Sequence, residues 1–387
     1  METLKKTKKM KLPLRSDSFT RTHTLPDELI EEILQRLPVR SLLRFKCVCK
    51  SWLALISNPQ FAKSHYDMAA APTHRLLLVK TYPDGPLESI GIDAPLHDDS
   101  ARVYLPRPQS SLIPSVSSNY LEILGSCRGI ILLKYRKEDD DLILWNPSTG
   151  ARKTISCSPG HKFLYGFGYD PSTDDYLVVI AMESSTKFKT HMEFFSLKTN
   201  SWNKVKGINF PYFDNGTRVT VRSGFLLNEA LHWVVFSKGD FTKDVIIAFD
   251  LIKRSLSEIL LPPDFPRKYE IWHFMVIEGC LGLACSRGVC WVMKEYKVQL
   301  SWTKSIVSSN INCYIEHIPC GSYYHICFSI RAGIVGSDDR GKLLKLDDKG
   351  ELLEISRIMQ WLHKERPLRC AIYTESLQSF PSDFGET

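Results

Sequence analysis

The stretch LPDELIEEILQRLPVRSLLRFKCVCKSWLALISNPQF, residues 25–61, decides the fold of the first part of the chain. Its apolar residues recur at the spacing of one helix face and not at the alternating spacing of a strand. Pro26 suits the first turn of a helix, where its missing N–H removes no hydrogen bond, and Pro38 stops that helix. Ser41 is a candidate N-cap for a second helical run, which ends at the Asn-Pro pair of residues 58–59. The stretch therefore predicts a small helical module.

This module holds more large apolar side chains than two or three short helices can bury among themselves. A module of about forty residues has only a marginal core when it folds alone. Its apolar surface must therefore pack against the rest of the chain or remain available to a partner. Both alternatives stay open at this point.

The stretch resembles an F-box. The resemblance rests on Leu-Pro pairs at residues 25–26 and 37–38, the Val-Cys-Lys triplet at 48–50, and the closing residues Pro59 and Phe61. It implies that part of the matching set contacts a Skp-type adaptor while the rest forms the core of the module, and the sequence does not divide them. The matching positions are Leu25, Pro26, Leu29, Ile33, Leu37, Pro38, Leu42, Val48 and Trp52. The alternative is an ordinary helical cap on the core of the next domain.

The composition is that of a globular protein. The chain has 387 residues, enough for one small and one large domain, and 43% of them are hydrophobic and 24% charged. No run approaches about eighteen consecutive apolar residues and no apolar leader begins the chain, so we expect neither a membrane span nor secretion. The eleven cysteines are then expected to be reduced thiols.

The formal net charge of +7 is concentrated at the start of the chain, because residues 1–24 contribute +5 of it. The remaining chain is nearly neutral at +2, which argues against nucleic-acid binding by the folded part. We expect residues 1–24 to be a disordered basic tail, and its KKTKKMK run is compatible with a nuclear import signal. The expected location is the cytoplasm, the nucleus or both.

From about residue 70 to residue 375, short apolar runs alternate with Gly, Pro, Asn and Asp, which predicts β-structure. One unit recurs, consisting of an apolar strand, a polar turn and a second strand. It appears as ILWNPSTGARKTI (143–155), FFSLKTNSWNKV (194–205), IAFDLIKRSLSEI (247–259), VMKEYKVQLSWTK (292–304) and LLKLDDKGELLEI (343–355). Markers in these units are 50, 54, 45 and 52 residues apart, close to the period of about 50 residues of one class of propeller blade.

The predicted fold class is therefore α+β multidomain. We expect the all-α F-box at residues 25–65, an all-β propeller of about six blades at 70–375, and a C-terminal tail at 376–387.

Four motifs in the β region resemble the F-box-associated domain of plant F-box proteins. They are Cys-Arg-Gly (127–129), Leu-Trp-Asn-Pro-Ser-Thr (144–149), Gly-Phe-Gly-Tyr-Asp (166–170) with Asp-Asp-Tyr (174–176), and Leu-His-Trp (231–233). In physical terms these motifs are turns and packing residues. We expect Gly166 and Gly168 to allow close backbone approach near the propeller axis. Indoles are expected to fill the gaps between blades at Trp145, Trp202, Trp233, Trp291 and Trp302.

We predict no catalytic residues, metal or cofactor. Cys280, Cys285 and Cys290 lack a second pair at zinc-finger spacing and are expected to be small buried hydrophobes. The acidic run at residues 138–141 is expected to be a hairpin loop, although a bound cation is the alternative. The Gly-Phe-Gly motif lacks the third glycine of a dinucleotide loop. The histidines are scattered without recognisable partners, at His161, His191, His232, His273, His317 and His325.

The two resemblances imply a non-catalytic substrate receptor of a Skp–cullin–F-box ubiquitin ligase. The F-box of such a receptor binds a Skp-type adaptor and, through it, the cullin scaffold, while the propeller selects a protein substrate for ubiquitination and degradation. One alternative is an adaptor-bound interaction protein without a degradative role. Another, from a different class, is a propeller enzyme with a site at the axial mouth.

Loops of the propeller are the expected substrate surface, because the strands are committed to the scaffold. We select the acidic run at 138–141 and two loops that combine aromatic and charged side chains, at 210–217 and 262–269. The candidate substrate-binding residues in the last two are Tyr212, Phe213, Phe265, Arg267 and Lys268.

Overall fold

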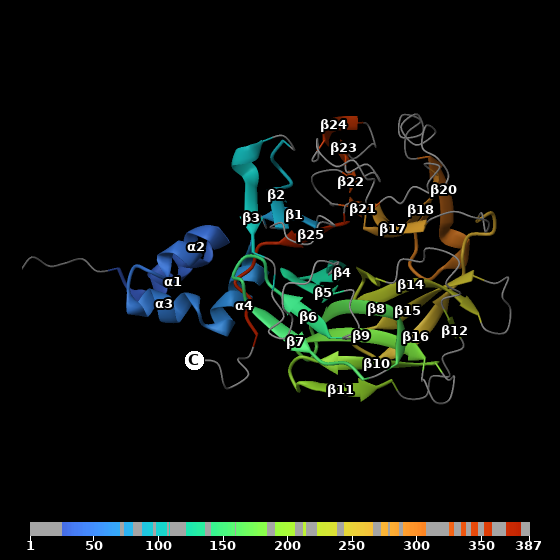
Figure 1. Ribbon diagram of the computed structural model, residues 1–387, viewed down its shortest axis with the longest axis horizontal. Helices are drawn as coiled ribbons and strands as arrows, with labels where there is room; N and C mark the ends of the chain where they lie inside the picture. The colour runs from blue at the N-terminus through green and yellow to red at the C-terminus, as the bar shows by residue number, and fades with distance from the viewer. Residues whose placement is uncertain are drawn as a thin grey trace, which may run out of the picture.

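The computed structural model describes most of the chain. The described residues are 25–69, 73–79, 87–95, 98–106, 108, 121–135, 141–158, 160–183, 190–205, 212–213, 223–237, 244–265, 272–277, 279–285, 289–306, 325–328, 334–337, 342–346, 352–357 and 369–380. They form four helices followed by sheets (Figure 1). Among the described residues, no helix is long and apolar enough to cross a bilayer.

The helical module consists of α1 (Asp27–Gln35), α2 (Val39–Phe45), α3 (Lys50–Ile56) and α4 (Pro59–Met68). The predicted second helix is thus two helices, and the prediction of Ser41 as its N-cap is wrong. Helix α2 begins at Val39 because Pro38, in an extended conformation, occupies the cap position. Helix α4 has a side-chain cap, since the Asn58 carboxamide accepts hydrogen bonds from Gln60 N at 2.7 Å and Phe61 N at 3.4 Å.

One apolar cluster holds the four helices together. Its buried members on the helices are Leu34, Val39, Leu42, Ile56, Phe61 and Ala62. The rings of Phe45 and Trp52 lie 5.5 Å apart and join α2 to α3. His65 on α4 is buried, and its Nε2 lies 2.8 Å from the carbonyl oxygen of Leu37. The four helices therefore pack around one small core.

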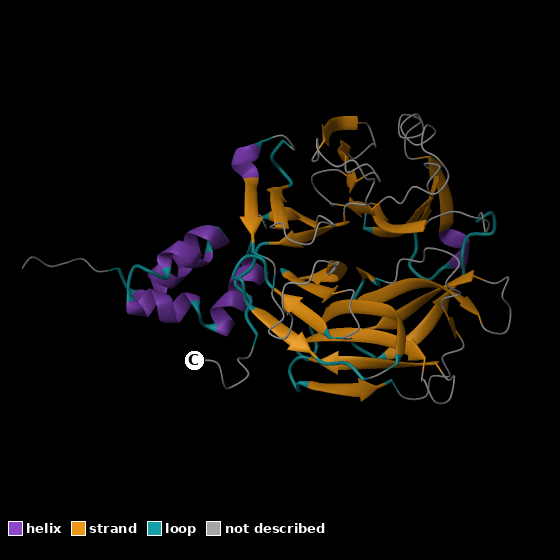
Figure 2. Ribbon diagram, in the orientation of Figure 1, coloured by secondary structure: helices purple, strands orange, loops and turns teal. Residues whose placement is uncertain are grey.

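The described strands form six sheets, which we call blades 1 to 6 and which Figure 2 shows as the strand-rich part of the molecule. Blade 1 contains β1 (His74–Val79), β2 (Leu87–Gly91), β3 (Arg102–Leu105) and β25 (Arg369–Thr374). Blade 2 contains β4 (Leu121–Cys127), β5 (Ile130–Tyr135), β6 (Leu142–Trp145) and β7 (Arg152–Ile155). Blade 3 contains β8 (His161–Asp170), β9 (Asp175–Glu183), β10 (Thr190–Ser196) and β11 (Ser201–Lys204).

Blade 4 has five strands: β12 (Tyr212–Phe213), β13 (Phe225–Leu227), β14 (Ala230–Ser237), β15 (Asp244–Asp250) and β16 (Ser255–Ile259). Blade 5 contains β17 (Trp272–Ile277), β18 (Cys280–Cys285), β19 (Val289–Met293) and β20 (Trp302–Ile306). Blade 6 contains β21 (His325–Phe328), β22 (Ile334–Ser337), β23 (Lys342–Leu346) and β24 (Leu352–Arg357). Two short 3-10 helices, η1 (Asp99–Ala101) and η2 (Gln299–Ser301), precede β3 and β20. The predicted fold, helices followed by a propeller of about six blades, is confirmed.

The repeating unit of the sequence corresponds to the same hairpin in five successive blades. These hairpins are β6–β7, β10–β11, β15–β16, β19–β20 and β23–β24, the last two strands of blades 2 to 6. The two strands of each of these hairpins are antiparallel and adjacent in sequence, so the period of the pattern is the period of the blades.

Blade 1 joins the two ends of the propeller domain. Its first strand in spatial order is β25, which pairs antiparallel with β1 so that Leu77 lies opposite Ala371. This pairing closes the ring across almost three hundred residues of sequence. The repeat did not predict it, because the partner strand lies outside the repeated hairpin.

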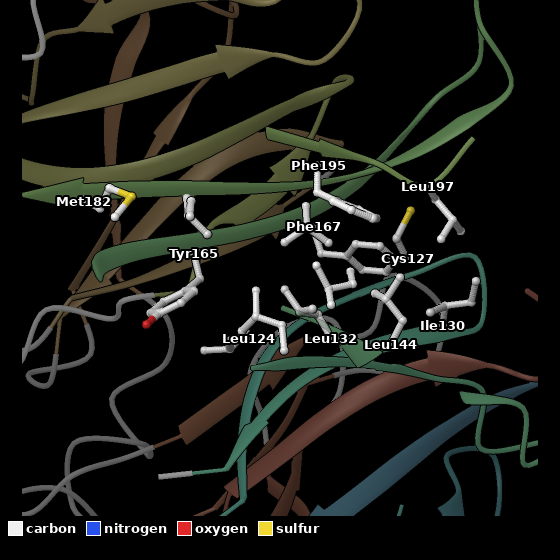
Figure 3. Packing of buried hydrophobic residues seen from close by; sticks show 14 residues of the cluster. Leu124, Cys127, Ile130, Leu132, Leu144, Tyr165, Phe167, Met182, Phe195 and Leu197 are labelled. Carbon is white, nitrogen blue, oxygen red and sulfur yellow. The ribbon is translucent and has the colours of Figure 1, made fainter. Parts of the chain in front are cut away.

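The core lies between blades. In Figure 3, Leu124, Leu132 and Leu144 of blade 2 face Phe167 and Phe195 of blade 3, and all five belong to one buried cluster. Three of the predicted indoles are buried in clusters of this kind, and they are Trp145, Trp233 and Trp291.

Gly166 and Gly168 allow close approach between blades 3 and 4. A Cβ on Gly166 would lie 2.7 Å from the indole of Trp233, and one on Gly168 would lie 2.5 Å from Leu251. Neighbours do approach closely at both glycines, but they are side chains of the next blade and not backbone, and the position near the propeller axis stays a prediction.

The two remaining indoles link outer strands of neighbouring blades. Trp202 on β11 donates a hydrogen bond from Nε1 to the carbonyl oxygen of Ser156, just after β7, at 2.9 Å. Trp302 on β20 makes the equivalent bond to the carbonyl oxygen of Leu260, just after β16, at 3.0 Å. Since both indoles also pack partly against interblade clusters, they join two blades by the same device.

Candidate functional site

An apolar surface remains exposed on the helical module. Leu29 and Ile33 lie one turn apart on α1 and are 46% and 50% exposed, while their neighbour Leu34 is buried. Leu25, Val48 and Leu53 are also about half-exposed or more. We call these five residues the apolar face of the F-box. Helix α1 therefore has one apolar side in the core of the module and another that the rest of the described chain leaves uncovered.

The structure divides the residues predicted to include the adaptor contacts. Six are exposed, and they are Leu25, Pro26, Leu29, Ile33, Pro38 and Val48. Leu37 and Trp52 are half-buried against the core, and Leu42 lies inside it at 0% exposure. Leu53 belongs to the apolar face but was not selected, because the neighbouring Trp52 matched the F-box pattern and Leu53 did not.

The module contacts the propeller through α4. The guanidinium of Arg128, in the turn between β4 and β5, lies between the rings of Tyr66 and Tyr169, 4.4 Å from each centroid. It also donates a hydrogen bond to Asp67 on α4 at 2.5 Å. Burial acts to lower the pKa of Arg128, but the hydrogen bond to Asp67 and other interactions raise it above its ordinary value. Arg128 therefore remains charged and joins blade 2, blade 3 and α4.

A second contact of α4 uses the turn between β8 and β9. Lys63 forms an ion pair with Asp174 at 2.6 Å, and the Tyr169 hydroxyl donates a hydrogen bond to the same carboxylate. The hydrogen bonds from Lys63 and Tyr169 lower the pKa of Asp174. Arg128 and Asp174 both have positive φ, at 49° and 53°.

The third contact comes from the end of the chain. Glu375 accepts a hydrogen bond from Arg40 on α2 at 3.0 Å, and Leu377 is buried in the helical core. The buried Asn146 carboxamide donates to the carbonyl oxygens of Ser376 and Gln378, at 3.1 and 2.7 Å. Residues 376–380, placed by the sequence in a C-terminal tail, include the buried Ser376 and Leu377 and form part of the folded structure.

These three contacts, from Arg128, from Asp174 and from the C-terminal segment, form the interdomain interface. The motifs that hold them were interpreted from the sequence as turns. Their second role was missed, because their partners are between 61 and more than 230 residues away and no local pattern identifies them.

The helices cover one end of the propeller strands. The contacts come from the turns β4–β5, β6–β7 and β8–β9, and Figure 1 shows the helices beyond that end of blades 2 and 3. The last residue of β5 and the first residue of β6 lie at the other end of blade 2. Strand β12 pairs with Phe236 and Ser237, at the end of β14 away from its turn with β13.

The candidate substrate residues have different outcomes. Tyr212 and Phe213 form β12, and their side chains lie outside the description. Phe265 is 4% exposed, and its ring lies 5.5 Å from that of Trp291 between blades 4 and 5. The structure contradicts its selection, because a ring in the core offers no binding surface. Arg267 and Lys268 lie outside the described residues, as does the acidic run except for Asp141.

His232, on β14, has a polar neighbour at each of its two ring nitrogens. It is fully buried, its Nδ1 lies 3.1 Å from the carbonyl oxygen of Phe225, and its Nε2 lies 2.7 Å from the Tyr296 hydroxyl. Since a carbonyl only accepts, Nδ1 carries the proton and Nε2 accepts from Tyr296. Burial lowers the pKa of His232 to about 4, so the ring is neutral and links blades 4 and 5.

Cys290 is buried beside Met275 and Val292, as predicted for a small hydrophobe, whereas Cys280 is only half-buried. Within the described part of the chain, no three His, Cys, Asp or Glu side chains are grouped as a metal site.

Comparison with known proteins agrees with this architecture. Residues 23–64 match the F-box domain family, and residues 96–342, more than half of the chain, match the family described as F-box associated beta propeller domain. F-box/kelch-repeat protein At3g23880 of Arabidopsis thaliana is 30% identical over 329 residues, covering 81% of this chain and 87% of that protein. F-box protein CPR1 of Arabidopsis thaliana is 29% identical over 313 residues, covering 73% of this chain and 72% of that protein.

A solved chain from a nidogen/laminin complex covers 79% of this chain and 99% of its own length, with a TM-score of 0.46 and 11% identity, too low to carry an argument. The two domain matches and the relatives, taken with the helices and the propeller, show that the chain belongs to the family of plant F-box proteins with an F-box associated β-propeller domain.

Proposed function

We propose that this protein is the substrate-recognition subunit of a Skp–cullin–F-box ubiquitin ligase. In this role the apolar face of the F-box binds a Skp-type adaptor, which links it to the cullin scaffold. The propeller binds a protein substrate and presents it for ubiquitination and degradation. The protein performs no chemistry itself and acts by raising the local concentration of substrate near the conjugating enzyme.

The observation that supports adaptor binding is the apolar face of the F-box. Its five side chains make none of the interdomain contacts described above, and they remain 46–60% exposed. Covering half of a large aliphatic side chain contributes about 1 kcal/mol. Five of them supply about 5 kcal/mol towards association, before its entropic cost is subtracted.

The position of the helices supports substrate binding by the propeller. They contact the turns at one end of blades 2 and 3, so the interdomain interface does not use the opposite ends of these strands. We therefore place substrate recognition at the end of the propeller opposite the F-box.

The adaptor half is tested with the double variant Leu29→Ala/Ile33→Ala. Alanine keeps the helix intact, so the change removes apolar area alone. Losing about 2 kcal/mol weakens adaptor binding about 30-fold in a titration with purified adaptor. The matched control is Val298→Ala/Leu300→Ala, which removes two aliphatic side chains that are 43% and 95% exposed on the propeller. Equal adaptor affinity for the two double variants would contradict the assignment.

Reconstituted ubiquitin transfer separates the proposal from the alternative of a non-degradative interaction protein. Proteins that co-purify with the full chain are incubated with adaptor, cullin and conjugating enzymes. The receptor role requires that they are modified, and that the Leu29→Ala/Ile33→Ala variant loses this modification while it still binds them. Binding without modification by the unaltered protein would favour the alternative.

A further inference from the structure

The segment Glu375–Gln378 connects the closed propeller ring to the core of the F-box. It follows β25 directly, which pairs with β1 and closes the ring. The backbone N–H of Glu375 then donates to the carbonyl oxygen of Thr73 at 2.9 Å, just before β1. The chain therefore leaves the ring closure in a fixed direction.

On one side this segment completes the helical module. Leu377 is 5% exposed and belongs to the same cluster as Leu34 on α1 and Phe61 on α4. The buried carboxylate of Glu375 lies 3.0 Å from Arg40 on α2 and 3.6 Å from Arg75 on β1. A small core depends strongly on each large member, so a side chain from the far end of the sequence is part of what holds α1 in place.

On its other side the segment is held by blade 2. Asn146 is fully buried and donates to Ser376 and Gln378, and the backbone N–H of Ser376 donates to the Ser148 hydroxyl at 3.3 Å. A Cβ on Gly129 would collide with Ser376, so the glycine of the Cys-Arg-Gly turn makes room for the segment. Two motifs of the propeller thus form its binding site.

We propose that Glu375–Gln378 is a strap that makes the adaptor surface of the F-box depend on closure of the propeller ring. Leu377 acts through α1, because it belongs to the same buried cluster as Leu34. Leu34 is adjacent in sequence to Ile33, which is part of the apolar face. When the strap is absent, α1 loses part of its support and the apolar face loses its fixed geometry. A chain with an intact F-box sequence but an unclosed ring is then a poor adaptor ligand. The statement about the adaptor rests on the proposed function, whereas the coupling between ring and helices does not.

The test uses the full chain with Leu377→Ala, compared with Leu377→Met and with a chain that ends after Phe380. Methionine conserves the volume of the side chain, and the shortened chain keeps the whole strap. Hydrogen exchange is measured in α1, in α4 and in the propeller strands β8 and β9, and adaptor affinity is measured by titration.

For Leu377→Ala we expect exchange in α1 and α4 to accelerate at least about tenfold, while β8 and β9 change less than about twofold. We expect the adaptor affinity to fall at least about fivefold. Leu377→Met and the chain that ends after Phe380 should have the exchange rates and adaptor affinity of the unaltered protein.

Unchanged hydrogen exchange in α1 and α4 would contradict the proposal that the strap supports the helices. Equal acceleration in β8 and β9 would overturn it too, because the effect would then be a general loss of stability. If the unaltered protein does not bind the adaptor, the proposed function fails, and the exchange rates still decide whether the strap couples the two domains.

Discussion

The Arg128 contact allows the interdomain interface to be measured as a coupling energy. Replacing Arg128 by alanine removes the cation between Tyr66 and Tyr169 and the hydrogen bond to Asp67. Alanine and arginine meet the same backbone restriction at φ 49°, so the change acts through the side chain.

The expected magnitude follows from the geometry. Each cation–π contact at 4.4 Å contributes about 0.5–2 kcal/mol, and the guanidinium is mostly shielded at 17% exposure. Asp67 is 44% exposed, so its ion pair contributes no more than about 1 kcal/mol. Arg128→Ala should therefore lower the free energy of opening of α4 by about 2–4 kcal/mol, with about 1 kcal/mol shared specifically between Arg128 and Tyr66.

A double-mutant cycle of Arg128→Ala and Tyr66→Leu isolates this shared part. The opening free energy of α4 is obtained from native-state hydrogen exchange, which reports on the helix without requiring two-state unfolding of the whole chain. Other contacts of Tyr66 are lost in both arms of the cycle and cancel.

In the control cycle, Arg254 is mutated and Arg128 is left unchanged. Arg254 also has positive φ, at 55°, and also pairs with an aspartate, Asp170, at 2.7 Å. That pair joins blades 3 and 4, so Arg254→Ala and Tyr66→Leu should be additive within about 0.5 kcal/mol. Additivity in the Arg128 cycle as well would refute the reasoning that the stacked cation holds α4 on the propeller.

Three further predictions concern the propeller. Trp145→Ala and Trp233→Ala should each lower the free energy of unfolding by about 3–5 kcal/mol in urea denaturation, because both indoles are buried between blades. Gly166→Ala should destabilise by about 1–3 kcal/mol in the same assay, since its Cβ would lie 2.7 Å from the Trp233 ring. His232 has its pKa lowered to about 4, so the unfolded chain takes up its proton first as the pH falls. Its contribution to stability is complete above about pH 6.5 and about 3 kcal/mol is lost towards pH 4, a loss that urea titrations of His232→Gln should not show.

The sequence predicted what depends on local pattern. Helical spacing identified the helical character of residues 27–56, although as two runs instead of three helices, and it did not predict α4, which begins at Pro59. The turn chemistry after each apolar strand identified the outer hairpins of five blades. The residue type of Ser41 predicts a cap, but the rigid Pro38 sets the start of α2 three residues earlier. Phe265 is a predicted binding residue because the loop at 262–269 combines aromatic and charged side chains, yet its ring is buried against Trp291, where its apolar area is removed from water.

The closure of the ring and the interdomain interface were beyond prediction for a different reason. The β25–β1 pairing and the contacts of Asn146 join residues between about 230 and 300 positions apart. Contacts at such separation leave no periodicity in the sequence, since each partner has only the local features of a strand or a turn.

The two residues of the Cys-Arg-Gly turn each have a second role besides forming the turn. In Cys-Arg-Gly, the left-handed conformations of Arg128 and Gly129, with φ of 49° and 83°, make a two-residue hairpin turn. A turn alone would be satisfied by Asn-Gly, which adopts this conformation at lower cost. Arginine is less favourable in this left-handed conformation, but its long side chain reaches from the end of blade 2 to α4. The missing Cβ of Gly129 leaves space for Ser376. Both residues are therefore better explained by what lies beyond the turn than by the turn itself, and the F-box is seated by the same residues that shape the propeller hairpin.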